Sequence, residues 1–155
     1  MISLQEAKEL VLKQAHSFGK EKIQLDDAIG RVLCQTISAD RDYPPFNRAT
    51  MDGIAININD WNNGIRSFAV AEIIYAGGIS KKKISAGECY KIMTGASVPQ
   101  PANAVIRIED ITEENNRLSI NVSEVNSFQN IALKGKDIKQ QSTIINNAVV
   151  CTASV

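Results

Sequence analysis

The feature that constrains the fold most is a succession of short β-type runs from Gly53 onward, with no helical periodicity between them. Turn signals rich in Gly, Pro, Asn and Ser separate each run from the next. The expected strands are 54–58, 68–75, 89–93, 104–108 and 118–125. Because strands at this spacing without intervening helices are typical of antiparallel sheets, we predict an α+β fold that is mainly β, with short and mostly antiparallel strands.

One amphipathic helix is expected at the N-terminus, ahead of these strands. Ser3 and Glu6 fit a capping box, and apolar residues then recur at helical spacing. A helical turn is expected at 25–29, a strand at 31–37, and one or two further strands in the tail 143–155. The tail ends without a cap, which we interpret as a cut between domains.

Charge and hydropathy narrow the classes of function. Lys and Arg together number 17, as do Asp and Glu, whereas a nucleic-acid binder needs a local surplus of cations to neutralise phosphates. No apolar run approaches the roughly 18 residues that span a bilayer, and the first residues lack the pattern of a signal peptide. We therefore expect a cytoplasmic protein that binds neither nucleic acid nor membrane.

The three cysteines and the single histidine suggest no site. Cys34, Cys89 and Cys151 are odd in number and include no C-x-x-C pair, so thiols that fill the core are expected rather than disulfides or a zinc cluster. His16 has no Asp, Cys or second His at ligand spacing, which favours a solvated or capping role.

A first loop, 42–53, combines polar side chains with a glycine. Pro44 and Pro45 stiffen its start, and the carboxylate of Asp52 could ligate Mg²⁺ or orient a water. The alternative is structural, because Asp52-Gly53 ahead of an alternating run is also a strong signal for a β-hairpin turn.

Two further loops carry candidate ligand-binding groups. Thr94-Gly95 follows an expected strand, where a hydroxyl and successive N–H groups could form an anion-binding nest; a plain turn explains it equally well. Lys134 and Lys136 flank a glycine and precede Asp137, which suits a phosphate or oxyanion with its metal; the alternative is a solvated turn.

In order, these loops resemble the N-terminal region of the molybdopterin molybdenumtransferase family, the MoeA and gephyrin E-domain proteins. The family patterns L-x-x-A-x-G-R-V-L, D-x-P-P-F-x-x-x-x-M-D-G-x-A, I-M-T-G-A-x-x-P, A-V-V-x-x-E and N-x-R-x-x-G-E-D are resembled at 25–33, 42–55, 92–99, 104–109 and 130–137. The similarity covers nearly the whole chain. Several colinear motifs are more specific than any one of them.

The resemblance implies an enzyme of molybdenum cofactor biosynthesis that inserts molybdate into adenylylated molybdopterin, releasing AMP, in a Mg²⁺-dependent reaction on a homodimer. Asp52, Thr94 and Asp137 match functionally important family positions, and Glu109 is a weaker candidate. Asp52 and Asp137 would hold the metal ion and its waters, while Thr94 would donate a hydrogen bond to phosphate or molybdate. Cofactor binding is expected from neighbouring residues of the same loops: Gly53, Gly95, Lys134 and Lys136.

The resemblance also implies an elongated, two-lobe arrangement. Residues 1–45 with 140–155 would form a discontinuous helix and strand lobe, and residues 46–139 an inserted β-rich lobe that carries the site loops. We expect that the family's α/β pterin-binding domain and its C-terminal β domain are not part of this chain. We therefore expect this chain to be the N-terminal region of the enzyme, inactive by itself.

Departures from the family patterns support a second interpretation. Ala132 and Lys136 stand where N-x-R-x-x-G-E-D has Arg and Glu, and Ala49 and Ile54 replace the Ser and Tyr of S-A-M-D-G-Y. Asn103 replaces the Asp of P-x-G-A-D. An oxyanion clamp that needed a bidentate Arg would be weakened, because Lys cannot reproduce the guanidinium fork. The alternative is a degenerate, non-catalytic homologue that binds a ligand or partner.

Overall fold

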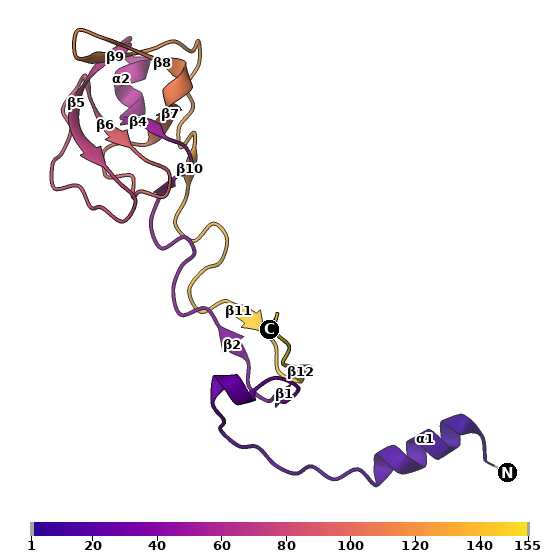
Figure 1. The fold of residues 1–155 in the computed structure, drawn as a ribbon. Coiled ribbons are helices and arrows are strands. Elements are labelled where there is room, and N and C mark those ends of the chain that lie inside the picture. The colour runs from indigo at the N-terminus through magenta and orange to yellow at the C-terminus, as the bar shows by residue number, and fades with distance from the viewer. Residues whose placement is uncertain (1, 155) are drawn as a thin grey trace. The chain divides into compact units, whose positions relative to one another are not determined.

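The computed structural model describes residues 2–154 and confirms a mainly β fold with an N-terminal helix (Figure 1). Contacts divide the chain into two compact units: residues up to Ile37 with those from Ile144 onward, and Ser38–Thr143. The lobe boundaries inferred from the resemblance, after residues 45 and 139, stay a prediction. Neither α-helix within 2–154 has the length and apolar character needed to cross a bilayer.

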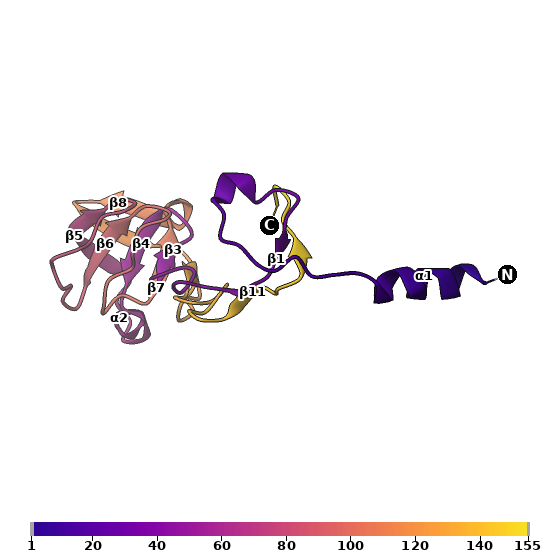
Figure 2. The same ribbon diagram turned by 90° about the horizontal axis from the view of Figure 1, so that it is seen from below.

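The second unit contains a curled sheet of six strands in the order β7-β4-β6-β5-β9-β8. Figure 2 shows β5, β6 and β4 side by side in this sheet. All neighbours are antiparallel except β5 and β6, which are parallel. The strands are β4 (Gly53–Ile56), β5 (Ser67–Ile74), β6 (Glu88–Ile92), β7 (Ala104–Arg107), β8 (Ile111–Glu114) and β9 (Arg117–Ile120). The strand expected over 118–125 is thus shorter, and β8 was not predicted.

Short strand pairs complete the β structure. They are β1 (Val32–Leu33) with β12 (Val149–Val150), β2 (Ile37–Ser38) with β11 (Thr143–Ile145), and β3 (Arg48–Ala49) with β10 (Ile131–Ala132). The strand expected over 31–37 is therefore divided between β1 and β2. The tail contributes β11 and β12 as predicted.

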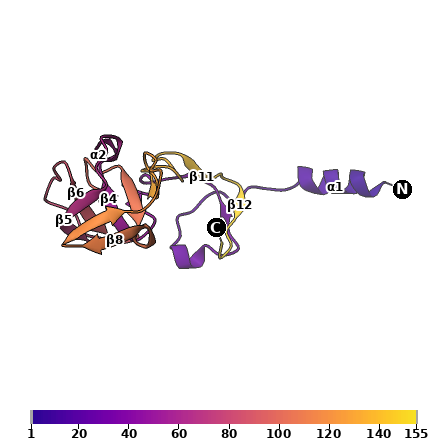
Figure 3. The ribbon, with the colours of Figure 1, turned by 90° about the horizontal axis from the view of Figure 1, so that it is seen from above.

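A short helix, α2 (Ile58–Asn62), replaces the end of the first predicted strand and lies to one side of the sheet (Figure 3). Its start is capped twice, because the side chain of Asn57 accepts the N–H of Asn59 and that of Asn103 accepts the N–H of Ile58. Trp61 is buried on its inner side. Local capping and one aromatic anchor thus override the β-type pattern.

Apolar clusters cover both faces of the central strands. All four residues of β4 are buried; Ala55 belongs to one cluster, and Ile54 and Ile56 to the other. Because both faces are covered, the strand reads as a continuous apolar run. The cluster containing Ala55 also includes Ala49, Ala96 and Ile131, so the three candidate loops are anchored in the core.

The first unit buries little of its apolar surface. Helix α1 (Leu4–Lys13) has the predicted capping box, because Ser3 Oγ accepts the N–H of Glu6 and the Glu6 carboxylate accepts the N–H of Ser3. The expected helical turn is a 3₁₀ turn at Leu25–Asp27. No described residue of this unit is buried, and Leu4 is 88% exposed.

The cysteines only partly meet the expectation. Cys89 is fully buried, and burial raises the pKa of its thiol to about 12, as expected of an inert core residue. Cys34 is exposed and Cys151 half-buried, so the prediction of core thiols is wrong for Cys34. Cys34 lies just beyond β1, in the unit whose described residues include none that is buried.

Candidate functional site

Strand β3, in the first loop, joins the three candidate loops. The N–H of Ala49 donates to the carbonyl of Ala96, and the N–H of Gly95 donates to the carbonyl of Ala49, each at 2.9 Å. On its other side β3 pairs with β10, which leads into the third loop, with Ala49 opposite Ile131. The β-hairpin alternative for Asp52-Gly53 is wrong, because β3 and β4 pair with other strands and not with each other.

The third loop folds against the start of the first. The N–H of Gly135 donates to the carbonyl of Pro44, and the N–H of Asp137 donates to that of Tyr43, both at 2.9 Å. Gly135 has a φ of +69°, and a Cβ there would lie 3.3 Å from the Asp42 carboxyl group. The backbone conformation thus favours glycine, and a Cβ would also require a small shift of the Asp42 side chain.

Asp52 and Thr94 are directly hydrogen-bonded to each other. Oδ1 of Asp52 accepts the Thr94 N–H at 2.6 Å and the Thr94 hydroxyl at 2.7 Å. These two bonds, that from the backbone N–H first, lower the pKa of the exposed Asp52 carboxyl group below its ordinary value. Asp52 is therefore ionised, oriented and a weak base at neutral pH, which suits binding a cation better than accepting a proton.

The glycines of these two loops have structural reasons to be glycine. A Cβ at Gly53 would lie 1.7 Å from the carbonyl oxygen of Ile106, because β4 is paired on both sides at this point. Gly95 has a φ of +86°, which favours glycine, in the turn that presents Thr94. Both residues shape the loops whether or not a cofactor approaches them.

The lysines of the third loop differ in their surroundings. The ammonium group of Lys134 lies 3.5 Å from the carboxylate of Asp42, and its backbone N–H donates to Oδ1 of Asn47. The N–H of Gln140, first, and Lys134 lower the pKa of Asp42. Lys136 is exposed and forms no ion pair within residues 2–154. Of the two, Lys136 is the cation more available to a ligand.

Asp137 and Glu109 are exposed, and neither is linked to Asp52 by a hydrogen bond through its side chain in the described chain. Glu109 lies in a 3₁₀ turn, Ile108–Asp110, whose first N–H donates to the carbonyl of Asp52. Residues 2–154 contain no cluster of three or more His, Cys, Asp or Glu suited to a metal. Oδ2 of Asp52 accepts no hydrogen bond in that range, which leaves it available to a cation.

Asn47 is a residue of the site that the sequence analysis missed. Its side-chain oxygen accepts the N–H of Lys134, and its carbonyl accepts the N–H of Val98, both at 2.9 Å. One residue of the first loop thus holds the other two. A short amide side chain in a loop commonly bonds backbone groups, but sequence alone does not say which ones.

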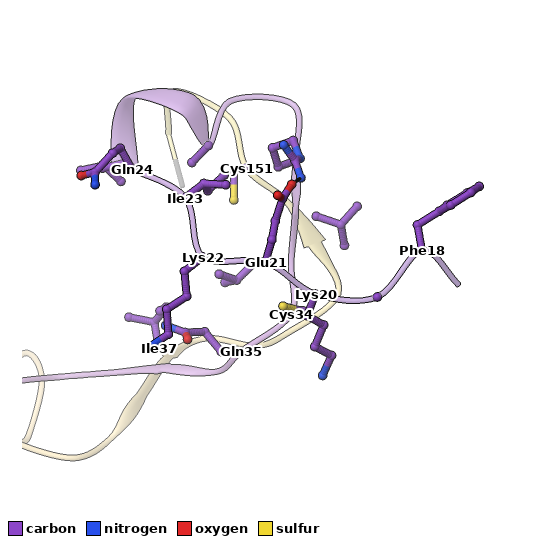
Figure 4. A pocket seen from close by; sticks show the side chains of 16 residues that line it. Phe18, Lys20, Glu21, Lys22, Ile23, Gln24, Cys34, Gln35, Ile37 and Cys151 are labelled. Carbon is purple, nitrogen blue, oxygen red and sulfur yellow. Dashed lines mark hydrogen bonds and ion pairs between the residues drawn. The ribbon is translucent and has the colours of Figure 1, made fainter. Parts of the chain in front are cut away.

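A cavity of about 800 Å³ lies elsewhere, in the first unit, and includes no predicted site residue (Figure 4). It is bounded by residues 18–37 and Cys151. None of its lining residues is buried, and Phe18 is fully exposed and points away from the other labelled side chains. Since ligand pockets bury most of the ligand surface, this open space is not our candidate site.

Comparison with known families identifies the region to which the chain corresponds. Residues 2–155 match the family described as the MoeA N-terminal region (domain I and II). Molybdopterin molybdenumtransferase of Staphylococcus epidermidis is 33% identical over 99% of this chain, and that of Synechocystis is 35% identical over 77%. The chain spans 38% and 31% of the length of these two relatives.

A solved structure agrees with this match. The molybdopterin biosynthesis moeA protein of Pyrococcus horikoshii is similar with a TM-score of 0.86 and 32% sequence identity. The similarity covers 97% of this chain and 41% of that protein. The fold and the sequence therefore point to the same region of the same kind of protein.

Proposed function

The chain belongs to the family of the MoeA N-terminal region, and we propose that it is part of a molybdenum insertase that transfers molybdate into adenylylated molybdopterin and releases AMP. The names of its relatives support a transferase of molybdenum cofactor biosynthesis. We further propose that the full-length protein catalyses this reaction on these two substrates in the cytoplasm.

The hydrogen-bonded pair of Asp52 and Thr94, at 2.6 and 2.7 Å, is the main support for this function. Two donors on Oδ1 fix the direction of the carboxylate and keep it ionised. Asp52 then presents Oδ2, as an oriented charge, toward a cation or a donor on the substrate. Thr94 positions this carboxylate, and Asp137 and Lys136 supply further charge from the third loop.

We propose Mg²⁺ as the cation of this site, because Asp52 and Asp137 offer the carboxylate oxygens that this ion prefers. Proteins commonly bind this ion through one or two carboxylates, with phosphate oxygens and waters as the other ligands. Asp52, with Oδ2 available, and the exposed Asp137 would be the protein ligands. When bound, the ion neutralises negative charge on phosphate oxygens.

The chain alone is proposed to be inactive, because it spans about two fifths of its relatives. Adenylylated molybdopterin is a large anion that needs a pocket burying most of its surface, and the exposed loops provide none. A homodimer of the full-length protein is part of the proposal, and the exposed apolar side chains of the first unit support contacts with further protein.

The test is Asp52→Ala in the full-length protein, followed by AMP release from adenylylated molybdopterin. We expect turnover to fall by at least 100-fold, or about 2.7 kcal/mol, while the melting temperature stays within a few degrees, since an exposed side chain is removed. Glu113→Ala is the matched control, because it removes an exposed carboxylate of the same unit that no family pattern includes. Equal activity of the two variants would reject Asp52 as a site residue.

The second candidate is a degenerate homologue that binds a ligand or partner without catalysis. It is favoured by the third loop, where Ala132 and Lys136 replace residues of the family pattern and where Lys134 is paired with Asp42. Reading the coding sequence beyond Val155 separates the two. A downstream α/β domain supports the insertase, and a stop codon supports the binding module.

A further inference from the structure

Arg48 lies on the outward face of β3, opposite one residue from each of the other two loops. Its partner in β10 is Ala132, and on its other side it forms a bridge with Ser97. Directly opposed residues of antiparallel strands point to the same face, so these three side chains share one face. Ala49, the next residue, points into the core and is 1% exposed.

Arg48 is the one arginine of the described chain without a partner for its guanidinium group. It is exposed, and its side chain forms no hydrogen bond or ion pair within residues 2–154. The others donate to carboxylates or to carbonyl and hydroxyl oxygens: Arg31, Arg41, Arg66, Arg107 and Arg117. Five donors on Arg48 are thus available to a ligand.

The residues beside Arg48 complement it. Ser97 is half-buried, and its hydroxyl forms no hydrogen bond in the described range, which makes it a second available donor. Ala132, on the other side, adds only a methyl group and leaves room for the guanidinium fork. Strand pairing fixes the backbone positions of Arg48 and Ser97. The entropy cost of binding a ligand is therefore limited to ordering their two side chains.

We propose that Arg48 and Ser97 bind one tetrahedral oxyanion. The planar guanidinium donates two parallel hydrogen bonds to such a group, and the hydroxyl donates a third. Arg48 and Ser97 lie on the loops that carry Asp52 and Thr94, so the inference rests on the proposed function and specifies a ligand class for these loops. Molybdate and the phosphate of AMP share this chemistry.

The test uses the 155-residue chain labelled with ¹⁵N, titrated separately with sodium molybdate and with AMP at constant ionic strength. We expect the amide signals of Ser97 and Ala132 to shift with saturation. Arg48→Gln should weaken binding at least tenfold, Arg48→Lys less because the charge remains, and Ser97→Ala about threefold. The ligand that saturates at the lower concentration identifies the source of the oxyanion.

Arg41→Gln is the matched control, because it removes the same charge from an exposed arginine of the same unit. Equal weakening by Arg41→Gln and Arg48→Gln, or no shift at Ser97 and Ala132 with either ligand, would overturn the inference. Neither result affects the turnover test of Asp52→Ala in the full-length protein, so the proposed function and this inference can fail separately.

Discussion

At the scale of single residues, the two hydrogen bonds from Thr94 to Asp52 make the stability of the protein depend on pH. Asp52 has a folded-state pKa below its unfolded value, so its stabilising contribution is present above the unfolded pKa and is lost as pH falls through the folded one. Thr94→Ala removes the hydroxyl donor and keeps the backbone N–H, which is the larger cause of the low pKa. In a ¹³C titration of the side-chain carboxyl, we therefore expect this variant to raise the Asp52 pKa only part of the way toward the ordinary range. Thr94→Ser, which keeps both donors, should leave it low; identical titrations of all three proteins would contradict the bond.

Gly53 gives a second prediction at this scale. A Cβ at Gly53 would lie 1.7 Å from a backbone oxygen between paired strands, so Gly53→Ala should cost about 4–5 kcal/mol, near the upper limit for single substitutions. Gly64→Ala is the control, because it has open space and only the strain of a φ of +89°, about 1–2 kcal/mol. Denaturant unfolding measures both, and equal losses would argue against the close approach.

At the scale of elements, Asn47 connects the loops through two chemically different acceptors. Asn47→Ala removes the side-chain acceptor of the Lys134 N–H, which costs about 1 kcal/mol, and keeps the carbonyl that accepts the Val98 N–H. Hydrogen exchange should therefore accelerate at Lys134 about fivefold and stay nearly unchanged at Val98. Acceleration at both amides would mean that the variant has lost the fold of β3.

Sequence periodicity found the elements with a strong apolar pattern and missed those without one. The central strands and the capping box of α1 were predicted, because burial on both faces and the Ser3–Glu6 pair leave clear patterns. Strand β8 was missed since its four residues, Ile111–Glu114, are largely exposed. Strands β5 and β6 pair in parallel, although no helix lies between them. Because parallel neighbours are usually connected through a helix, the sequence contains no signal for this pairing.

In the candidate site too, the individual residues were predictable from sequence, whereas the contacts between them were not. Asp52 and Thr94 were each identified from local loop chemistry and the family resemblance. Their direct bond, across 42 positions, was not predictable from spacing. Strand β3 has two residues, too few for any periodicity, yet it joins all three loops. The convergence of the loops is therefore a property of the fold and not of any one motif.

At the scale of the whole molecule, the two units should differ in their ability to fold alone. Every buried apolar side chain of the described residues lies between Ala39 and Ile131, inside the second unit. We expect an excised 38–143 fragment to unfold cooperatively with a midpoint close to that of the whole chain. A fragment that is molten, with the whole chain cooperative, would show that the first unit stabilises the second.

We propose that this chain supplies one region of a molybdenum insertase and that the remaining regions of the full-length protein are needed for turnover. The most direct measurement is molybdate-dependent AMP release from adenylylated molybdopterin, compared at equal molar concentration for the 155-residue chain and the full-length protein. We predict turnover by the full-length protein and none above background by the chain alone. Turnover by the chain alone would mean that the remaining regions are not needed, and no turnover by a folded full-length protein would mean that it is not an insertase.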